Sequence, residues 1–219
     1  MAVKDFMTKR VVYVSPETTV AAAADIMREK GLRRLPVIEH DKLVGLITEG
    51  TMAEASPSKA TSLSIYEMNY LLNKTKVGDI MIKNVLTVSK YASLEDAIYI
   101  MLQNKIGVLP VVDNDQISGI ITDKDVFRAF LEISGYGQAG IRIGLEVPDT
   151  PRVLEKIANL IASENLNIER TIVAPKNDTV LRVELQVEGE IGIDQLKKVF
   201  VEAGFTVTEI AETEAKELD

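Results

Sequence analysis

Two short stretches combine residue types that could hold an anion. One is Gly119-Ile-Ile-Thr-Asp-Lys-Asp125, and the other is Gly45-Leu-Ile-Thr-Glu-Gly-Thr51, which lies 74 residues earlier. Each reads as the end of a buried strand that turns into a helix, where free N–H groups and the helix dipole attract negative charge. The spacing Thr122-x-x-Asp125 is also that of a capping box, so the two side chains could simply close the start of a helix. The two interpretations are compatible.

These stretches belong to an internal repeat. Residues 3–52 align with residues 77–126 without a gap, at a constant offset of 74. Where the copies differ, one apolar residue usually replaces another. Identical pairs include Val3/Val77, Asp5/Asp79, Met7/Met81, Leu35-Pro36-Val37/Leu109-Pro110-Val111, Gly45/Gly119 and Thr48/Thr122. A unit of about 50 residues buries too little surface to be stable alone, so the copies should pack together.

Each copy is predicted to form a strand, a helix, two strands and a second helix. The first helix of each copy carries an apolar stripe at i, i+3, i+4 and i+7 spacing, and Ser93-x-x-Asp96 forms a capping box before the second of them. The last helix is clearest at 123–132. The predicted strands are 11–14, 35–38 and 43–47 in the first copy, and 109–112 and 117–121 in the second.

The copies are expected to span residues 1–58 and 77–134, joined by a linker helix within 59–76. In that segment Ser64-Ile-Tyr-Glu67 could cap a helix bearing Ile65, Met68, Leu71 and Leu72. We interpret it as a connector that covers the core, and a helix that binds a partner is the alternative. A second linker, residues 135–140, contains three glycines and ends the duplicated region.

The C-terminal part has a different pattern. Within residues 141–212, alternating apolar runs and two helical stripes follow one another in the order βαββαβ, the ferredoxin-like arrangement. The strands are predicted at 141–147, 167–174, 180–187 and 205–210, around helices centred on Ile157 and Leu196. The tail, residues 213–219, is acidic and is expected to fray. The predicted fold class of the whole chain is therefore α+β.

Both copies resemble cystathionine-beta-synthase (CBS) domains, whose tandem pairs form Bateman modules. The residues that carry this resemblance are Asp5-Phe-Met7, Asp79-Ile-Met81, the Leu-Pro-Val strands and the Gly-x-x-Thr junctions. The C-terminal part resembles an ACT domain, through Val147-Pro-Asp-Thr-Pro151 and Asn165-Leu-Asn-Ile168. A CBS pair followed by an ACT domain is similar to the acetoin-utilisation, AcuB-type family.

The resemblance implies a ligand that contains adenosine, such as AMP, ADP or ATP, bound in the cleft between the two copies. It assigns the hydroxyl of Thr122 to a phosphate and the carboxylate of Asp125 to the ribose hydroxyls, with Ile121 beside them. The first copy keeps Thr48 but has Thr51 in place of the aspartate. A hydroxyl cannot accept two ribose hydrogens as a carboxylate does, so we expect one good site and one weakened site.

Three further ligand contacts follow from the resemblance alone. Residues just before the Leu-Pro-Val strand commonly border the ligand, and Arg33 and Arg34 occupy that place in the first copy. The second copy has Gly107 and Val108 there. Guanidinium groups suit phosphate, although both arginines could simply be solvated surface. The predicted strand that contains Thr87 borders the ligand in the same way.

The resemblance to ACT domains is weaker at the positions that bind amino acids. Such domains often use a glycine directly after an Asp-x-Pro turn, whereas Asp149-Thr-Pro151 is followed here by Arg152. A side chain at that position removes the close backbone approach that glycine permits. Amino-acid sensing is therefore the less favoured role of this domain, and dimerisation through its sheet is expected instead.

Composition excludes several classes of function. The net charge is −8, and seven of these charges fall in residues 141–219, which disfavours binding of nucleic acid. The chain has no cysteine, and its one histidine, His40, lies in a polar turn, so no usual metal cluster or nucleophile–base pair can be assembled. No apolar run approaches the roughly 18 residues of a membrane span. The start lacks a signal pattern, so we expect a cytoplasmic location.

Two hypotheses remain from the sequence. In the first, the chain is a regulatory module without catalytic activity or an obligatory cofactor, and a nucleotide shifts how the copies or the subunits of a homodimer pack. In the second, both modules serve as a scaffold for dimerisation and docking to an unknown protein target, with a vestigial ligand cleft. The departures at Thr51 and Arg152 favour the second hypothesis. An enzyme is the least favoured possibility, because no residues predict turnover.

Overall fold

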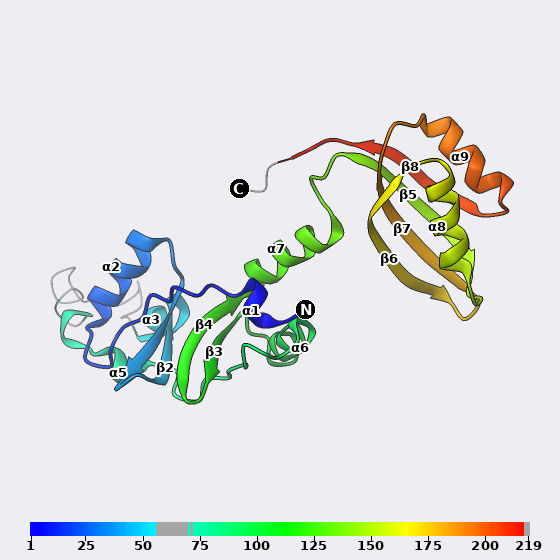
Figure 1. The fold of residues 1–219 in the computed structure, drawn as a ribbon. Helices are drawn as coiled ribbons and strands as arrows, with labels where there is room; N and C mark the ends of the chain where they lie inside the picture. The colour runs from blue at the N-terminus through cyan, green and yellow to red at the C-terminus, as the bar shows by residue number, and fades with distance from the viewer. Residues whose placement is uncertain (56–69, 71, 217–219) are drawn as a thin grey trace. The chain divides into compact units, whose positions relative to one another are not determined.

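The protein was analysed as a computed structural model, which describes residues 1–55, 70 and 72–216. It divides into two units, residues 1–129 and 130–219, each described by itself below (Figure 1). The linker helix predicted within 59–76 falls almost entirely outside the described residues. The last residues of α7 and the glycine-containing segment 135–140 belong to the second unit.

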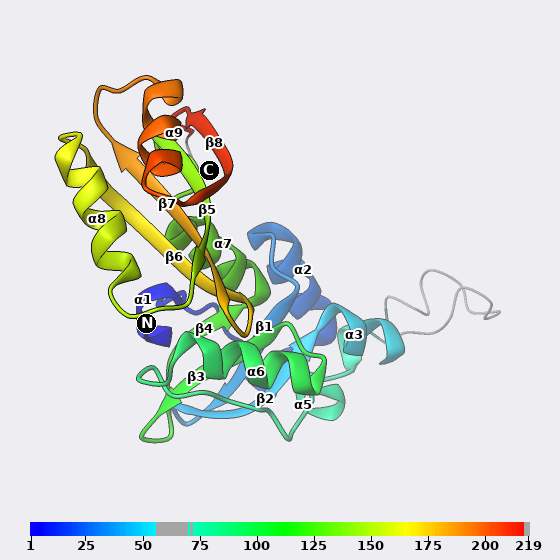
Figure 2. The same ribbon diagram turned by 90° about the vertical axis from the view of Figure 1, so that its right-hand side faces the viewer.

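The first unit contains the two copies of the repeat. Its elements are α1 (Val3–Phe6), α2 (Val20–Lys30), β1 (Arg34–Glu39), β2 (Lys42–Thr48), α3 (Glu49–Ala55), α5 (Val77–Ile80), α6 (Leu94–Asn104), β3 (Val108–Asp113), β4 (Gln116–Thr122) and the start of α7 (Asp123–Ser134). The strands form one antiparallel sheet in the order β1-β2-β4-β3, and Figure 2 shows its two hairpins side by side. The hairpins meet where Lys42 pairs with Gln116, two residues related by the offset of 74.

The two copies exchange their first segments. Thr8 of the first copy pairs with Ile120 in β4, and Ile82 of the second copy pairs with Leu46 in β2. Each pairing consists of two backbone hydrogen bonds of 2.9–3.0 Å. The offset of 74 relates one pairing to the other, so the sequence repeat is also a repeat of contacts. Each copy thereby completes the other, as expected from the small size of one unit.

Helix starts follow the predicted capping residues. The Thr19 hydroxyl accepts from the backbone N–H of Ala22 at the start of α2. At the start of α6, Ser93 and Asp96 form both hydrogen bonds of a capping box, at 2.9 and 3.3 Å. Behind these caps the predicted stripes are buried, among them Val20, Ala23 and Met27 in α2 and Leu94, Ala97 and Met101 in α6.

The strand predicted at 11–14 is wrong. Only Val14 pairs, through one parallel bridge to Val37, and the same holds for Val88 and Val111 in the second copy. Extending the ladder by two residues would need a backbone N–H donor at Pro36, which proline lacks. Pro110 imposes the same limit on the second copy. Val12 and Tyr13 are accordingly exposed.

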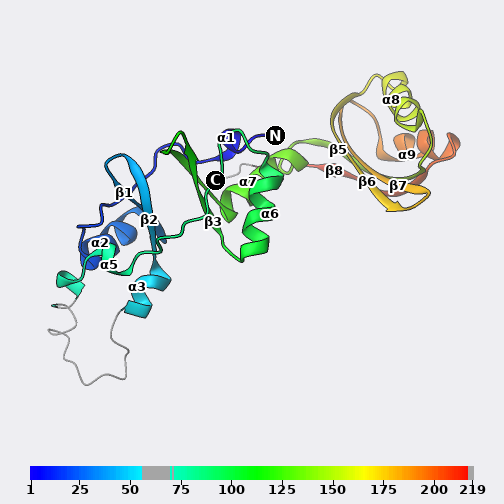
Figure 3. The same cartoon turned by 90° about the horizontal axis from the view of Figure 1, so that it is seen from below.

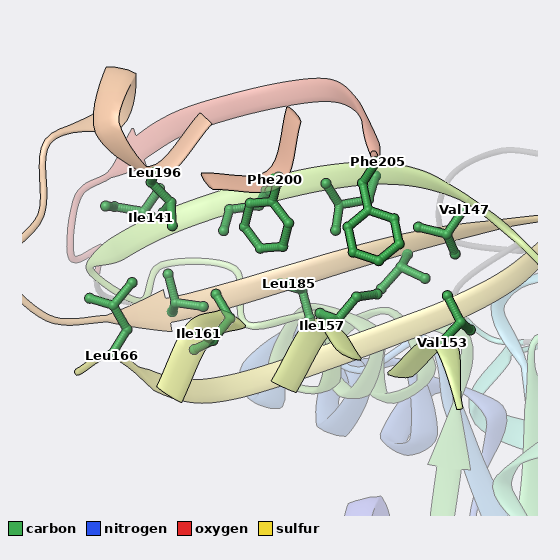
Figure 4. Close-up of a cluster of buried hydrophobic side chains, with 14 residues drawn as sticks. Ile141, Val147, Val153, Ile157, Ile161, Leu166, Leu185, Leu196, Phe200 and Phe205 are labelled. Atoms are coloured by element: carbon green, nitrogen blue, oxygen red, sulfur yellow. The ribbon is translucent and has the colours of Figure 1, made fainter. Parts of the chain in front are cut away.

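The second unit has the predicted βαββαβ order. Its elements are β5 (Gly140–Pro148), α8 (Val153–Ser163), β6 (Asn167–Asn177), β7 (Val180–Glu188), α9 (Ile193–Glu202) and β8 (Thr206–Thr213). The strands form an antiparallel sheet in the order β6-β7-β5-β8, and Figure 3 shows both helices on one face of it. That face holds the core, in which Phe200 and Phe205 pack with Leu185 and Ile157 (Figure 4).

The segment between α7 and β5 is held by hydrogen bonds. Gly135, at φ 72°, ends α7, and the N–H groups of Gly135 and Tyr136 return to the carbonyls of Glu132 and Leu131. From β6, Arg170 donates to the Gln138 side chain at 2.9 Å and to the Ile133 carbonyl at 3.2 Å. The three glycines therefore shape an ordered connection.

The prediction that the tail frays is wrong for its described residues. Thr213 belongs to β8, and its hydroxyl donates to the Gln138 carbonyl at 2.8 Å. The backbone N–H of Lys216 donates to the Gly137 carbonyl at 2.9 Å. Hydrogen bonds thus join the described part of the tail to the glycine-containing segment.

Candidate functional site

The junction between β4 and α7 is organised by Thr122 and Asp125 (Figure 1). Both the backbone N–H and the hydroxyl of Thr122 donate to Oδ2 of Asp125, each at 2.7 Å. The backbone N–H of Asp125 donates to the Thr122 hydroxyl at 3.4 Å. The predicted capping box is therefore present. Within the described part of the chain, no donor reaches the other carboxylate oxygen, Oδ1, which stays available to accept from hydroxyl groups.

The corresponding junction of the first copy closes on itself. The Thr51 hydroxyl accepts from the backbone N–H of Thr48 at 3.0 Å and donates its single hydrogen to the Thr48 carbonyl at 3.0 Å. The backbone N–H of Thr51 donates to the Thr48 hydroxyl at 3.1 Å. The geometry of the turn resembles that of the second copy, but Thr51 offers no second acceptor oxygen.

Arg34 crosses from the first copy to the second. Its Nη1 donates to the carbonyl of Gly107 at 3.0 Å, and the same carbonyl accepts from the backbone N–H of Asp123 at 3.2 Å. Asp123 directly follows Thr122, so Arg34 reaches the same junction from the opposite copy. A half-buried guanidinium therefore lies within this junction.

Gly107 makes room for this arrangement. A Cβ atom at Gly107 would lie 2.6 Å from Asp123 Oδ2 and 3.1 Å from Arg34 Nη2. Both charged groups thus lie against the glycine backbone. The sequence analysis did not single out Gly107 or Asp123 as site residues, although aligning the repeats places Gly107 opposite Arg33 and Asp123 opposite Glu49.

The remaining candidates lie elsewhere. Arg33 is exposed and forms a loose ion pair with Glu49 at 3.9 Å. Ile121 is fully buried in the core and therefore exposes no surface to a ligand at the junction. Thr87 is exposed and lines a separate open pocket of about 330 Å³, together with Lys42, Leu43, Lys83, Val85, Val112 and Asp115. The structure therefore brings together Thr122, Asp125 and Arg34, and separates them from Thr87.

The glycine of the Gly-x-x-Thr pattern has a packing role. A Cβ atom at Gly119 would lie 2.6 Å from Met7 Sδ and 2.9 Å from the carbonyl oxygen of Thr8. Gly45 has the same relation to Met81 and to the carbonyl of Ile82. These glycines permit the close approach of the exchanged first segments, which in turn fix the strands that end at the threonines.

Two searches of the described residues bear on other kinds of site. No group of three or more His, Asp or Glu side chains in this part of the chain could hold a metal ion. Among the same residues, no helix has both the length and the apolar character needed to cross a membrane.

The paired copies, the exchanged segments and the hydroxyl–carboxylate junction define a CBS-domain protein. The model of the CBS domain family matches residues 3–58 and 77–132, about half of the chain, and the chain belongs to this family. CBS-domain proteins are typically regulatory and non-catalytic.

Three known proteins illustrate the similarity. MJ1225 of Methanocaldococcus jannaschii is 34% identical over 130 residues, which are 58% of this chain and 46% of MJ1225, so the chain spans about half the length of that relative. The structure of CBSX2 in complex with AMP has 34% identity and a TM-score of 0.52 over 60% of this chain and 97% of that chain. CBSX2 is a chloroplastic protein of Arabidopsis thaliana. A Vibrio cholerae structure assigned to acetoin utilization (AcuB) has 27% identity and a TM-score of 0.53 over 63% of this chain and 98% of that chain.

Proposed function

We propose that this protein is a regulatory, non-catalytic sensor of a nucleotide that contains adenosine, with AMP as the first candidate. The ligand binds between the two CBS copies at the junction formed by Thr122, Asp125 and Arg34. The observation that carries the proposal is the oxygen Oδ1 of Asp125, to which no donor of the described residues is directed, at a junction where a guanidinium of the other copy binds the Gly107 carbonyl. The similarity to CBSX2, whose structure contains AMP, supports the same ligand class.

Different residues bind different parts of the ligand. A carboxylate that keeps one oxygen in the cap accepts from the ribose hydroxyls with the other. The Arg34 guanidinium is a donor, and guanidinium groups match the geometry of a phosphate. The Thr122 hydroxyl already donates its one hydrogen to Oδ2 of Asp125, so it can donate to the phosphate only after it turns away from that oxygen. The junction of the first copy has Thr51 at the aspartate position, and the second copy has Val108 at the position that corresponds to Arg34, so this junction holds a ligand weakly or not at all.

The signal is transmitted to a protein target through a homodimer in the cytoplasm. The second unit, with its βαββαβ topology, is proposed to be an ACT domain that dimerises through its sheet, as in the AcuB-type arrangement. Its Arg152, at φ 69°, occupies a left-handed position favoured by glycine. That substitution argues against amino-acid binding at this turn, and amino-acid sensing is the minor alternative.

A second candidate function is a scaffold for dimerisation and docking, without a ligand. The closed turn at Thr48 and Thr51 favours it, because one of the two junctions has no acceptor left for a ribose.

The experiment that separates the two functions is a thermal-shift screen of the full chain with AMP, ADP, ATP, S-adenosylmethionine and cyclic dinucleotides. A ligand that binds only the folded state raises the melting temperature by mass action. A shift with at least one adenosine derivative supports the sensor. No change in melting temperature with any of them, together with a stable dimer, supports the scaffold.

A further inference from the structure

The junction that ends β4 contains more carboxylates than a phosphate site needs. Asp123 and Asp125 both lie in the first turn of α7, and both are half-buried. Asp125 has a structural reason for its charge, since its Oδ2 accepts two hydrogen bonds from Thr122. Among the described residues, Asp123 accepts a hydrogen bond from the adjacent backbone N–H of Lys124, at 2.9 Å, and from no other donor. Its carboxylate lies instead against Gly107, beside Arg34.

The juxtaposition of Arg34 and Asp123 is specific to this junction. The repeat alignment places Val108 opposite Arg34, so no guanidinium stands at the equivalent position of the second copy. It also places Arg33 opposite Gly107, and the side chain of Arg33 carries its own loose ion pair with Glu49. The Arg34 guanidinium and two carboxylates thus lie at the junction that the proposed ligand occupies, and Lys124, between the two aspartates in the first turn of α7, is exposed.

We propose that Arg34 and Asp123 together set the number of phosphate groups that the site accepts, so that it prefers a nucleoside monophosphate to a triphosphate. This inference rests on the proposed function. Arg34 offsets the charge of the first phosphate, whereas each further phosphate adds negative charge near Asp123 and Asp125 without a second guanidinium from the opposite copy. Repulsion between like charges a few ångströms apart in a half-buried site is large enough to change an affinity about tenfold.

Asp123 also limits how far Arg34 can follow a longer phosphate chain. The guanidinium is held by the Gly107 carbonyl, and Arg34 Nη2 and Asp123 Oδ2 both lie close to where a Cβ atom at position 107 would stand. Arg34 therefore presents its charge from a fixed position. A fixed cation recognises one phosphate well and a flexible chain of three less well.

The test is calorimetric titration of the full chain with adenosine, AMP and ATP, without divalent cations, for the wild type and the variants Arg34→Gln and Asp123→Asn. We expect the wild type to bind AMP at least about tenfold more tightly than ATP. Asp123→Asn should narrow this ratio to about threefold or less, because it removes one of the two repelling charges. Arg34→Gln should weaken AMP about tenfold and leave adenosine unchanged.

The matched control is Glu49→Gln, at the position of the first copy that corresponds to Asp123, and it should leave the ratio of AMP to ATP affinity unchanged. Raising the salt concentration should reduce the ratio in the wild type, because salt screens the repulsion. Each ratio compares two ligands on the same variant, so a partly destabilised variant still gives an answer.

The outcomes distinguish a failure of the proposed nucleotide binding from a failure of the role given to Arg34 and Asp123. If adenosine, AMP and ATP all fail to bind the wild type, the proposed function is wrong. If they bind, but Asp123→Asn keeps the wild-type ratio, or Arg34→Gln weakens adenosine as much as AMP, the ligand class stands and the role given to Arg34 and Asp123 is overturned.

Discussion

Thr122 directs both of its hydrogen-bond donors to one oxygen of Asp125, at 2.7 Å each. The carboxylate therefore serves the helix cap with one oxygen, and no donor of the described residues is directed to the other. The sequence allowed two interpretations of the Thr-x-x-Asp pattern, as a cap and as a ligand site. The cap is present, and its geometry is compatible with the ligand site that we propose.

Variants of Asp125 should separate its contribution to helix capping from its contribution to ligand binding. Asp125→Asn keeps a side-chain oxygen that can accept from Thr122 and loses only the charge near the helix start, so the free energy of unfolding should change by about 0.5 kcal/mol. It loses the second acceptor oxygen, so binding of AMP should weaken at least about tenfold. Asp125→Ala should lose the binding and also about 1 kcal/mol of stability. Urea unfolding and calorimetry measure the two effects, and equal AMP affinity in Asp125→Asn and wild type would contradict this assignment.

Gly119→Ala should destabilise the first unit. The added methyl group would lie 2.6 Å from Met7 Sδ and 2.9 Å from the Thr8 carbonyl, so the exchanged segment must move away from β4. Overpacking of this kind costs about 1–3 kcal/mol, which urea unfolding can measure.

The matched control for this prediction is Gly50→Ala in α3. The nearest atom to a Cβ there is the Thr48 hydroxyl at 3.5 Å, so the space is open. Alanine is the better helix former, and this variant should gain about 0.5–1 kcal/mol. If Gly119→Ala were as stable as Gly50→Ala, the close approach of the first segment would not explain the glycine.

Arg152 combines an unfavourable backbone with a favourable ion pair. At φ 69° it holds a conformation that costs an L-residue roughly 1–2 kcal/mol, while its guanidinium makes two hydrogen bonds to Glu155, at 2.7 and 2.8 Å. The pair is exposed, so its contribution to the free energy of unfolding is small.

Replacing Arg152 separates these two terms. Arg152→Ala loses the ion pair and keeps the strain, whereas Arg152→Gly loses the ion pair and relieves the strain. The glycine variant should therefore be the more stable of the two by about 1 kcal/mol in urea unfolding. A more stable alanine variant would mean that the backbone at 152 is not strained.

Ser89 should make part of the stability depend on pH. Its hydroxyl donates to Asp113 at 2.7 Å, and this hydrogen bond, helped by the backbone N–H of Lys90, lowers the pKa of Asp113. A carboxyl whose pKa is lower in the folded state stabilises the fold above its unfolded pKa, and that contribution is lost as the pH falls through the folded value.

The variant Ser89→Ala tests this contribution. It should be less stable than the wild type near neutral pH, and the difference should shrink as the pH falls below the ordinary pKa of a carboxyl and through the lowered pKa of Asp113 in the folded state. NMR titration of Asp113 should show its pKa rising in the variant. A stability difference that stays constant with pH would show that Ser89 acts through packing alone.

Local sequence patterns predicted helices well where an apolar stripe defines them, and strands well where apolar and polar residues alternate. The offset of 74 predicted both hairpins, and the βαββαβ order of the second unit is confirmed. The strand at 11–14 was predicted wrongly, because a β-branched run gives no information on the donor that its neighbour, Pro36, lacks. The tail was predicted to fray because it is acidic. Composition gives no information on the backbone hydrogen bond from Lys216 to Gly137 that holds it.

The site was predictable only in part. Thr122 and Asp125 follow from the pattern within one copy, and the structure places them in contact. The link from Arg34 to Gly107 joins residues 73 positions apart, so it depends on how the copies pack. The alignment of the repeats contained one indication of this contact, because it pairs Arg33 with Gly107. The missing side chain at Gly107 leaves the space that Arg34 and Asp123 occupy.

The central claim is that a nucleotide binds at the junction of the second copy through Asp125. Calorimetric titration of AMP into the full chain tests it most directly, with the wild type and Asp125→Asn measured side by side. The account predicts saturable binding to the wild type with one AMP per chain, and at least about tenfold weaker binding to the variant. Absence of binding to the wild type, or the same affinity in both proteins, would contradict it.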